Sequence, residues 1–427
     1  LADENFGILK RDVEIAKIVR KCKEDYGYPQ SVFFYNDKRF TNTSRNVIEV
    51  IGDINPYGMC LALQTENPDT LKAINRRNVT EEEIDDAIAW ASERDISAST
   101  ELIFGMPHET RDSFVDLLNR SIKRRFDTVL VNHLFVMDGI EMNRPDYRKK
   151  YGIKTKYRLL GTNYAIQDDT FLAEHEEVVV STSSFTYEDY LTIRSQSFML
   201  YTVFYQNFQK WFFQFIRHKG ISLTEYFSLF TKPDRNVNWP EGYLRFLDDF
   251  KSAAEGELFD TREEMKAKAK EIYVANGNDV GDPTRINMNF SARLSYMESR
   301  WVKPVLMRHL EEIMPGGLSS EDRDIANSLI VLAECERINL RKVNGEDPLN
   351  ISFDVISWRK NKYNKSLYDL KMPKKSVKFS VSKTQASVLN SFRKRFASFS
   401  DMDFYFSAIQ LVRPQQNLLH NLTYDDR

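Results

Sequence analysis

Cysteine is scarce in this sequence: Cys22, Cys60 and Cys335 are the three among 427 residues, and no two of them form a C-x-x-C pair. This scarcity excludes a disulfide framework and indicates a reducing compartment, which predicts a cytoplasmic protein. It also excludes a self-contained zinc or iron–sulfur site with cysteine ligands. We therefore expect no metal ligands within this chain. We also assign no catalytic residue to it.

The chain also lacks a strong charge of either sign and a long apolar run. Its formal net charge of -2 gives no reason to expect a nucleic-acid partner. A membrane span needs about 20 nearly unbroken apolar residues, whereas the most apolar stretch, 198–230, contains Gln206, Lys210 and Arg217. We expect no membrane span, and a buried or interface helix for this aromatic stretch.

The chain starts at Leu1 without the basic region and apolar run of a signal peptide. Residues 1–6 instead resemble the end of a β-strand entering a loop. From this start we expect a fragment of a longer protein.

Strands and helices alternate regularly over the first 140 residues. Repeated β-α units with short connections predict parallel strands joined by right-handed crossovers. A partial barrel and an open doubly wound sheet both fit, and either one places the active site at the carboxyl ends of the strands. The expected strands are 1–6, 31–35, 59–64, 97–104 and 128–136, and the expected helices are 11–26, 43–54, one starting with a capping box at Thr80, and 110–124.

This alternation stops at about residue 145, which predicts three parts: 1–145, a mostly helical aromatic-rich region 146–345, and a small α+β segment 346–427. The stretch 147–157 is expected to be a surface excursion. Expected helices beyond it are 184–230, 256–275, 289–313, 322–339 and 384–396, and expected strands are 350–357 and 376–381.

Polar residues cluster where the first expected strand ends, in Asp3, Glu4 and Asn5. Carboxylate and amide groups beside free backbone carbonyls suit an ammonium group. The sequence D-E-N-F resembles the second strand end of the cobalamin-binding branch of the radical S-adenosylmethionine (SAM) superfamily. The resemblance implies that these residues bind the amino group of SAM.

The longest matching stretch is 59–76. It resembles the family's fourth strand, which ends in G-[IV]-[QE]-S and continues to L-x-x-[IM]-x-R. The resemblance implies that Gln64 binds the methionine moiety of SAM and that Arg76 meets its carboxylate. A planar guanidinium pairs with a carboxylate through two hydrogen bonds. Arg77 is the neighbouring alternative to Arg76.

Two further strand ends resemble the family. Residues 101–110 resemble its fifth strand end, x-[IF]-I-x-G-[LM]-P-x-E-T, which implies that Ile103 contacts the adenine and that Gly105 lets the ligand approach the backbone. His108 is expected to face solvent. At the sixth strand end, His133 is expected to face either the SAM cavity or the core.

The expected third strand end, 34–39, also resembles the family, and Asn36 is its polar candidate. Together these matches imply an α/β fold: a partial (β/α)6 TIM-like barrel lacking its first strand, followed by a mostly helical α+β C-terminal region. The C-x-x-x-C-x-x-C loop that holds the family's [4Fe–4S] cluster is absent from this sequence. In the full-length protein the resemblance implies SAM, this cluster, an electron donor for it, and cobalamin.

The implied function is reductive cleavage of SAM to start radical chemistry, with cobalamin-dependent methylation as the specific reaction. The substrate is an unknown small molecule or peptide, and we expect this fragment alone to be inactive. One alternative is a non-catalytic interaction module acting through the aromatic segment 211–215, and another is an unrelated α/β-barrel enzyme. The last alternative fails if Gln64 and Arg76 converge on one cavity in the structure, and it gains if they point apart.

Overall fold

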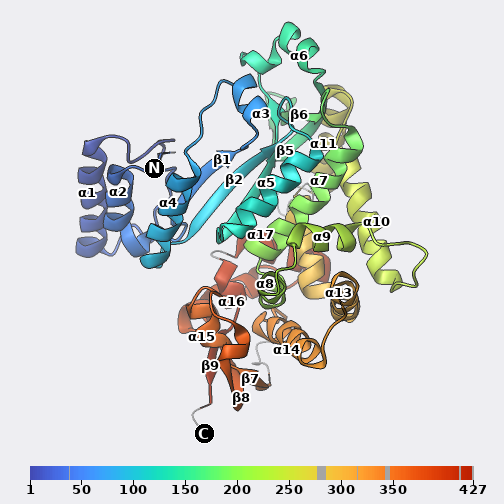
Figure 1. Ribbon diagram of the computed structural model, residues 1–427. Helices are drawn as coiled ribbons and strands as arrows, with labels where there is room; N and C mark the ends of the chain where they lie inside the picture. Colours follow the sequence, from blue (N-terminus) through green and yellow to red (C-terminus); the bar gives the residue numbers. More distant parts are fainter. Residues whose placement is uncertain (38, 277–284, 315, 342–346, 413–414, 426–427) are drawn as a thin grey trace. The chain divides into compact units, whose positions relative to one another are not determined.

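The computed structural model describes residues 1–37, 39–276, 285–314, 316–341, 347–412 and 415–425 (Figure 1). Internal contacts divide the chain into two compact units. Unit 1 comprises Leu1–Thr155 and Val178–Ile193, and unit 2 comprises Lys156–Glu177 and Arg194–Arg427. The sequence boundaries at 145 and 345 stay predictions.

A parallel three-stranded sheet forms the centre of unit 1. Its strands are β1 (Met59–Gln64), β2 (Ala98–Phe104) and β3 (Thr128–His133), in the order β1-β2-β3. The segments between them contain α3 (Pro68–Ala73), α4 (Glu81–Glu93) and α5 (Arg111–Lys123). The prediction of an α/β fold with parallel strands is confirmed.

Burial alternates along β2, because successive side chains of a strand point to opposite faces of the sheet. Leu102 and Phe104 are fully buried, and the Phe104 ring packs against Phe114 of α5 with 5.0 Å between ring centroids. The alternating residues Ser99, Glu101 and Ile103 are half-buried. The sheet therefore has one face packed on helices and a second, less buried face.

The predicted capping box at Thr80 is present. The Thr80 hydroxyl accepts a hydrogen bond from the backbone N–H of Glu83, and the Glu83 carboxylate accepts one from the backbone N–H of Thr80 (3.3 and 2.8 Å). These bonds satisfy N–H groups that have no partner inside the helix. The sequence therefore determines the start of α4 locally.

The predicted strands at 1–6 and 31–35 are reduced to a single parallel bridge between Phe6 and Asn36. The backbone N–H of Phe6 donates to Tyr35 O at 2.9 Å. Toward β1, the Asn36 side chain takes the place of backbone pairing: its Nδ2 donates to Cys60 O, and its Oδ1 accepts from the Cys60 N–H. A regular strand does not form, because a side-chain amide makes the connection to β1. Two helices flank this region and pack together, α1 (Lys10–Tyr26) and α2 (Asn42–Ile51).

The stretch 147–157, predicted as a surface excursion, instead contains most of a short helix and the start of a long β-hairpin. A short helix, α6 (Pro145–Tyr151), leads into β5 (Lys154–Gln167), and β6 (Thr170–Ser181) returns to pair with β5 and with the short β4 (Phe135–Val136). Asp168 and Asp169 both have positive φ, 47° and 62°. Two such residues match the type I′ turn that suits the twist of a hairpin.

The aromatic stretch predicted as one helix over 184–230 is broken into several. Its parts are α7 (Tyr187–Leu200), a π-helical turn (Tyr201–Tyr205), α8 (Lys210–His218) and α9 (Leu223–Thr231). The breaks coincide with positive φ at Asn207, Gln209 and Gly220. The further helices of unit 2 before residue 340 are α10 (Glu241–Gly256), α11 (Arg262–Asn276), α12 (Ile286–Ala292), α13 (Ser299–Ile313) and α14 (Ser320–Glu336). The expectation of a mostly helical C-terminal region is confirmed.

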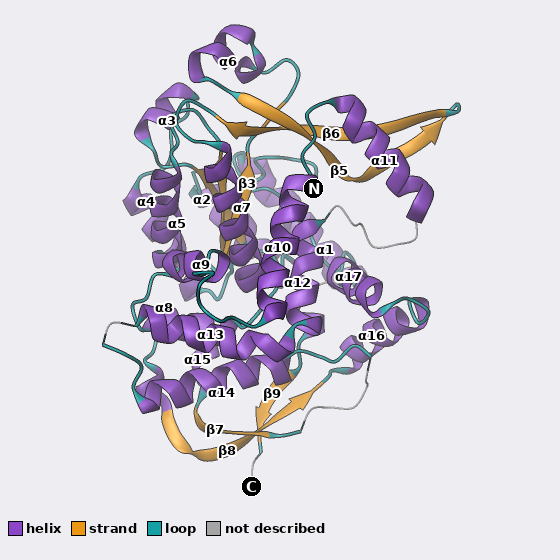
Figure 2. Cartoon of the chain, turned by 90° about the vertical axis from the view of Figure 1, so that its right-hand side faces the viewer, coloured by secondary structure: helices purple, strands orange, loops and turns teal. Residues whose placement is uncertain are grey.

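The last part of unit 2 contains an antiparallel sheet near the C-terminus, visible at the bottom of Figure 2. Its strands are β7 (Leu349–Phe353), β8 (Lys371–Ser380) and β9 (Asn421–Tyr424), in that order. The strand predicted for 350–357 ends early because Asp354 caps α15 (Val355–Lys360), accepting from the Ser357 N–H at 3.0 Å. Two more helices are α16 (Lys383–Arg395) and α17 (Asp401–Leu411).

None of the helices in the described ranges is both long enough and apolar enough to cross a membrane.

Gly58, just before β1, provides a test of the parallel sheet of unit 1. A Cβ at Gly58 would lie 2.0 Å from Ser97 O, the acceptor of the Met59 N–H, and its φ is +65°. We expect Gly58→Ala to lower the free energy of unfolding by about 3 kcal/mol, because it adds a backbone clash to the cost of positive φ. Urea unfolding followed by circular dichroism measures this change.

Gly27→Ala is the matched control, since Gly27 has φ +70° and no atom within 4 Å of its would-be Cβ. Its expected cost is about 1 kcal/mol. Equal losses for the two variants would contradict the register of β1 and β2 at this point.

Candidate functional site

The less buried face of the parallel sheet carries a row of half-buried or exposed side chains. We call it the open face, and its members are Cys60, Ala62, Ser99, Glu101, Ile103, Leu130 and Asn132. The register pairs Glu101 with Leu130 and Ile103 with Asn132. Since paired residues of parallel strands project to the same side, these side chains share one surface.

Gln64 lies where β1 ends, in a strained turn. Its φ is +60°, and the backbone N–H of Thr65 donates to Leu63 O at 2.7 Å. An i to i+2 hydrogen bond around a residue with positive φ describes a rare form of γ-turn. Within the described residues, the Gln64 carboxamide makes no hydrogen bond. Such strain is typical of ligand sites, which supports a functional role for Gln64.

Arg76 reaches back to β1 from the loop after α3. Its Nη2 donates to Ala62 O at 2.6 Å, and its Nε donates to Asn78 Oδ1 at 3.0 Å. The side chain is half-buried, and this burial lowers the pKa of the guanidinium from its usual value. No carboxylate among the described residues pairs with it. The structure therefore brings Arg76 and Gln64 to the same strand end.

Arg77, the alternative to Arg76, is exposed. No hydrogen bond or ion pair in the described part of the chain involves its side chain. This difference between adjacent arginines favours Arg76 as the group that belongs to the site.

Buried hydrogen bonds join the loops that follow β1 and β2. Thr65 and Glu109 are both fully buried, and the Thr65 hydroxyl donates to Glu109 Oε2 at 2.5 Å. The Thr70 hydroxyl donates to Pro107 O at 2.8 Å. Burial raises the pKa of Glu109, and hydrogen bonds from Ser113 and Thr65 act against that rise. The two loops thus form one rigid edge, with Glu109 as a connecting group that the sequence motif did not reveal.

The predicted adenine contact and the predicted glycine have different surroundings. Ile103 lies on the open face, as its proposed role requires. Gly105 has φ +112°, and a Cβ there would lie 3.2 Å from Leu134 Cβ. The glycine therefore allows the chain beside it to pack closely.

His133 lies on the opposite face of the sheet from Ile103. It pairs in register with Phe104, is 8% exposed, and its ring lies 4.8 Å from that of Tyr190 in α7. Of the two predicted orientations, the structure gives the one toward the core, so it does not support a cofactor contact. Asn132, which the sequence did not single out, occupies the open-face position.

The remaining predicted residues lie near the Phe6–Asn36 bridge. Asp3, Glu4 and Asn5 form an exposed turn in which Asp3 Oδ1 accepts from the Asn5 N–H at 2.9 Å. Asn36 is 7% exposed, and its amide bonds Cys60 N, Cys60 O and Asp37 O at 2.9–3.0 Å. Its hydrogen-bonding groups are thus committed to backbone, which does not favour a ligand role.

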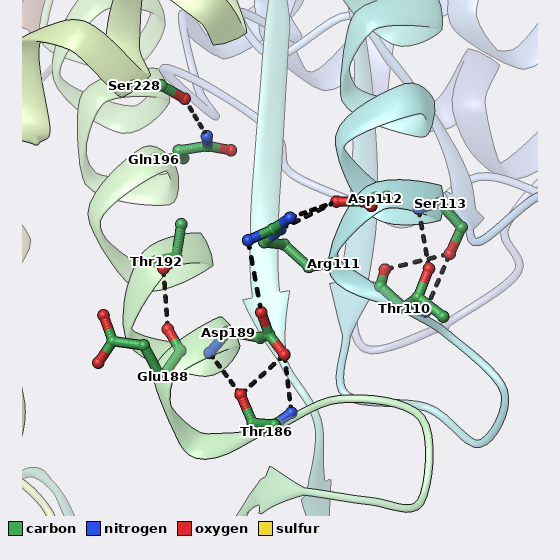
Figure 3. A network of polar contacts seen from close by, with 10 residues as sticks. All are labelled: Thr110, Arg111, Asp112, Ser113, Thr186, Glu188, Asp189, Thr192, Gln196 and Ser228. Carbon is green, nitrogen blue, oxygen red and sulfur yellow. Dashed lines mark hydrogen bonds and ion pairs between the residues drawn. The ribbon is translucent and has the colours of Figure 1, made fainter.

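Polar contacts lie at the starts of α5 and α7 and join these two helices (Figure 3). Thr110 caps α5, exchanging hydrogen bonds of 3.0 Å with Ser113. Arg111 lies between Asp112 and Asp189 of α7, at 2.8 and 3.8 Å. His108 in the preceding loop is exposed, as predicted. These contacts hold the start of α5 in place next to the rigid edge.

Three titratable side chains influence one another on and beside the open face. Burial raises the pKa of Glu101, which makes no hydrogen bond or ion pair within the described residues. Burial and the Glu101 charge raise the pKa of Cys60 to about 11. Burial, Glu101, Cys60 and Glu4 also raise the pKa of Tyr35. Sequence patterns did not identify Glu101, because its effect on Cys60 and Tyr35 depends on the strand register that places it on the open face.

A cavity of about 620 Å³ lies elsewhere in unit 1. Its walls come from the start of α3, the start of α4, and α5, and they include Glu66, Glu81 and Asp116. Gln64, Arg76 and Ile103 are not among its lining residues. These three residues therefore lie outside the cavity lining, but Asn78, which accepts a hydrogen bond from Arg76, is part of it.

In the described ranges, no group of three or more His, Cys, Asp or Glu side chains is placed to hold a metal ion. Cys60 lies on the open face, but its raised pKa disfavours the thiolate form that binds metals. The residues described here do not fit a [4Fe–4S] cluster.

Comparison with known families gives a match for the first part of the chain. Residues 8–121 match the model of the radical SAM superfamily. This range includes β1, β2 and the residues Gln64, Arg76 and Ile103. The resemblance inferred from the strand-end motifs is confirmed for this part of the chain.

Two curated relatives are named as methyltransferases, and the name of one includes cobalamin. A cobalamin-dependent radical SAM methyltransferase, TokK of Streptomyces tokunonensis, is 26% identical over 258 residues, which are 58% of this chain and 34% of that protein. A 2-(S-pantetheinyl)-carbapenam-3-carboxylate methyltransferase of Streptantibioticus cattleyicolor is 25% identical over 238 residues, 50% of this chain and 35% of that protein. The chain thus spans about a third of the length of the curated relatives it matches.

The raised pKa of Glu101 predicts a pH dependence of stability. A carboxyl whose pKa is higher in the folded state than its ordinary 4.5 binds more protons folded than unfolded. Stability therefore falls as pH rises from about 4.5 through the folded pKa. We expect Glu101→Gln to remove this decline, so that the variant gains stability over the unchanged protein across that window.

Thermal unfolding measured from pH 4 upward in roughly half-unit steps detects the effect. Glu263→Gln, which changes an exposed glutamate of α11, is the control and should leave the pH profile unchanged. Parallel profiles for Glu101→Gln and the unchanged protein would contradict the buried setting of Glu101.

Proposed function

We propose that this chain forms part of the SAM-binding wall of a radical SAM enzyme. In this proposal Gln64 binds the methionine moiety of SAM, Arg76 pairs with its carboxylate, and Ile103 contacts the adenine. The observation that carries the proposal is Arg76: a half-buried guanidinium without a carboxylate partner among the described residues, held at the strand end where Gln64 turns the chain.

The hydrogen bonds of Arg76 leave it suited to a carboxylate ligand. Nε and one hydrogen of Nη2 are fixed by Asn78 and Ala62, while Nη1 makes no hydrogen bond in the described part of the chain. A carboxylate approaching Nη1 and the second hydrogen of Nη2 would form two parallel, charge-assisted bonds. Partial burial strengthens such a pair relative to one in open water.

The whole protein's reaction is proposed by analogy with its relatives. SAM cleaved reductively at a [4Fe–4S] cluster would supply the radical. Both relatives' names support methyl transfer, and the name of one supports the use of cobalamin. We assign no step to the cluster, because the described residues do not fit it. The substrate is proposed to be a small molecule or peptide, an electron donor serves the cluster, and the reducing compartment predicted from the cysteine content suits such chemistry.

Arg76→Ala in the full-length protein tests the proposal. Losing charge-assisted hydrogen bonds to a carboxylate costs about 1.5–3 kcal/mol, so we expect SAM to bind about 10- to 100-fold more weakly. Anaerobic equilibrium dialysis with radiolabelled SAM measures the affinity. Gln64→Ala should weaken SAM binding as well, by about fivefold, because it removes a neutral hydrogen-bonding group.

Arg77→Ala is the matched control, since it removes the adjacent, exposed arginine and should leave SAM affinity unchanged. Iron content should be equal in all variants. If Arg76→Ala binds SAM as tightly as the unchanged protein, the assignment fails. If the unchanged protein binds no SAM, the alternative of a non-catalytic interaction module gains.

A further inference from the structure

Asn78 connects the two side chains proposed to hold SAM. Its Oδ1 accepts a hydrogen bond from Arg76 Nε at 3.0 Å. Its Nδ2 donates to Leu63 O at 3.0 Å and to Thr65 O at 2.5 Å. Those two carbonyl groups flank Gln64, so one carboxamide contacts both the arginine and the turn.

The turn at Gln64 needs such support. A residue with positive φ in a γ-turn is held in a rarely populated conformation that costs free energy of order 1–3 kcal/mol. Such a conformation persists only where surrounding bonds determine it. Leu63 O accepts from both Thr65 N and Asn78 Nδ2, and Thr65 O accepts from Asn78 Nδ2 as well. Asn78 therefore closes the turn from outside the strand.

The Arg76 side chain must also be held in one orientation to bind a carboxylate well. A free arginine populates many rotamers, and fixing it on binding costs free energy that lowers affinity. The bond from Nε to Asn78 and the bond from Nη2 to Ala62 O set the plane of the guanidinium before any ligand arrives. Both candidate SAM contacts are thus oriented through a single residue.

We propose that Asn78 is a positioning residue that orients Gln64 and Arg76 for SAM without touching it. This inference rests on the proposed function. It requires a side chain that donates to carbonyls at one end and accepts from a guanidinium at the other, which a carboxamide does and a carboxylate does not.

Two substitutions test the role, both in the full-length protein with SAM affinity measured by anaerobic equilibrium dialysis. Asn78→Ala removes all three hydrogen bonds, and we expect SAM binding about tenfold weaker. Asn78→Asp keeps the shape but faces Leu63 O and Thr65 O with a carboxylate, and its charge competes with SAM for Arg76. SAM binding should therefore be weaker still in Asn78→Asp, and this variant also serves if Asn78→Ala does not fold.

A double-mutant comparison separates positioning from general stability. In the Arg76→Ala background one of the two targets of Asn78 is gone, so Asn78→Ala should weaken SAM binding by less than about threefold. Asn78→Ala should still lower the melting temperature in that background, because its bonds to Leu63 O and Thr65 O do not involve Arg76. A tenfold loss that persists without Arg76, or Asn78→Asp binding SAM as tightly as the unchanged protein, would overturn the inference.

Failure of the inference and failure of the proposed function give different results. If Arg76 and Gln64 do not bind SAM, Arg76→Ala and Gln64→Ala leave SAM affinity unchanged. If those two variants lose affinity while both Asn78 variants keep it, the proposed function stands and Asn78 has no positioning role.

Discussion

Regular pairing of β1 with β2 is interrupted after Leu61, and Gln64 then turns the chain with positive φ. The rest of the candidate site depends on how firmly this turn is held. The buried Thr65–Glu109 hydrogen bond joins the turn to the loop after β2. Asn78 donates hydrogen bonds to Leu63 O and Thr65 O, the carbonyl groups on the two sides of Gln64. A buried carboxyl is costly unless it is hydrogen-bonded, and here Thr65 and Ser113 supply the bonds.

The features that the sequence could predict are those specified locally. Apolar runs at 59–64, 97–104 and 128–136 indicated parallel strands, and the structure has β1, β2 and β3 within these ranges. The Thr80 capping box is a contact over three residues, and so can be recognised from spacing alone. The motif at 59–76 likewise led to Gln64 and Arg76, because a family resemblance carries information about distant contacts that periodicity lacks.

Features that depend on register or on non-local hydrogen bonds could not be predicted in the same way. A shift of one residue decides the face of a strand, and it places Asn132 on the open face and His133 against Tyr190. The Asn36 amide replaces strand pairing with Cys60, far away in sequence. The β5–β6 hairpin is not among the expected elements, because its turn residues, Asp168 and Asp169, are not the Asn-Gly or Asp-Gly pair that signals a two-residue hairpin turn.

The central claim is that Arg76 holds the carboxylate of SAM, and a structure of the full-length protein crystallised with SAM tests it most directly. We expect two nitrogen–oxygen distances of about 2.8 Å between the Arg76 guanidinium and the SAM carboxylate, with the Gln64 carboxamide against the same methionine moiety. A SAM carboxylate bound by other side chains, with Arg76 still directed only at Ala62 O and Asn78, would contradict the claim.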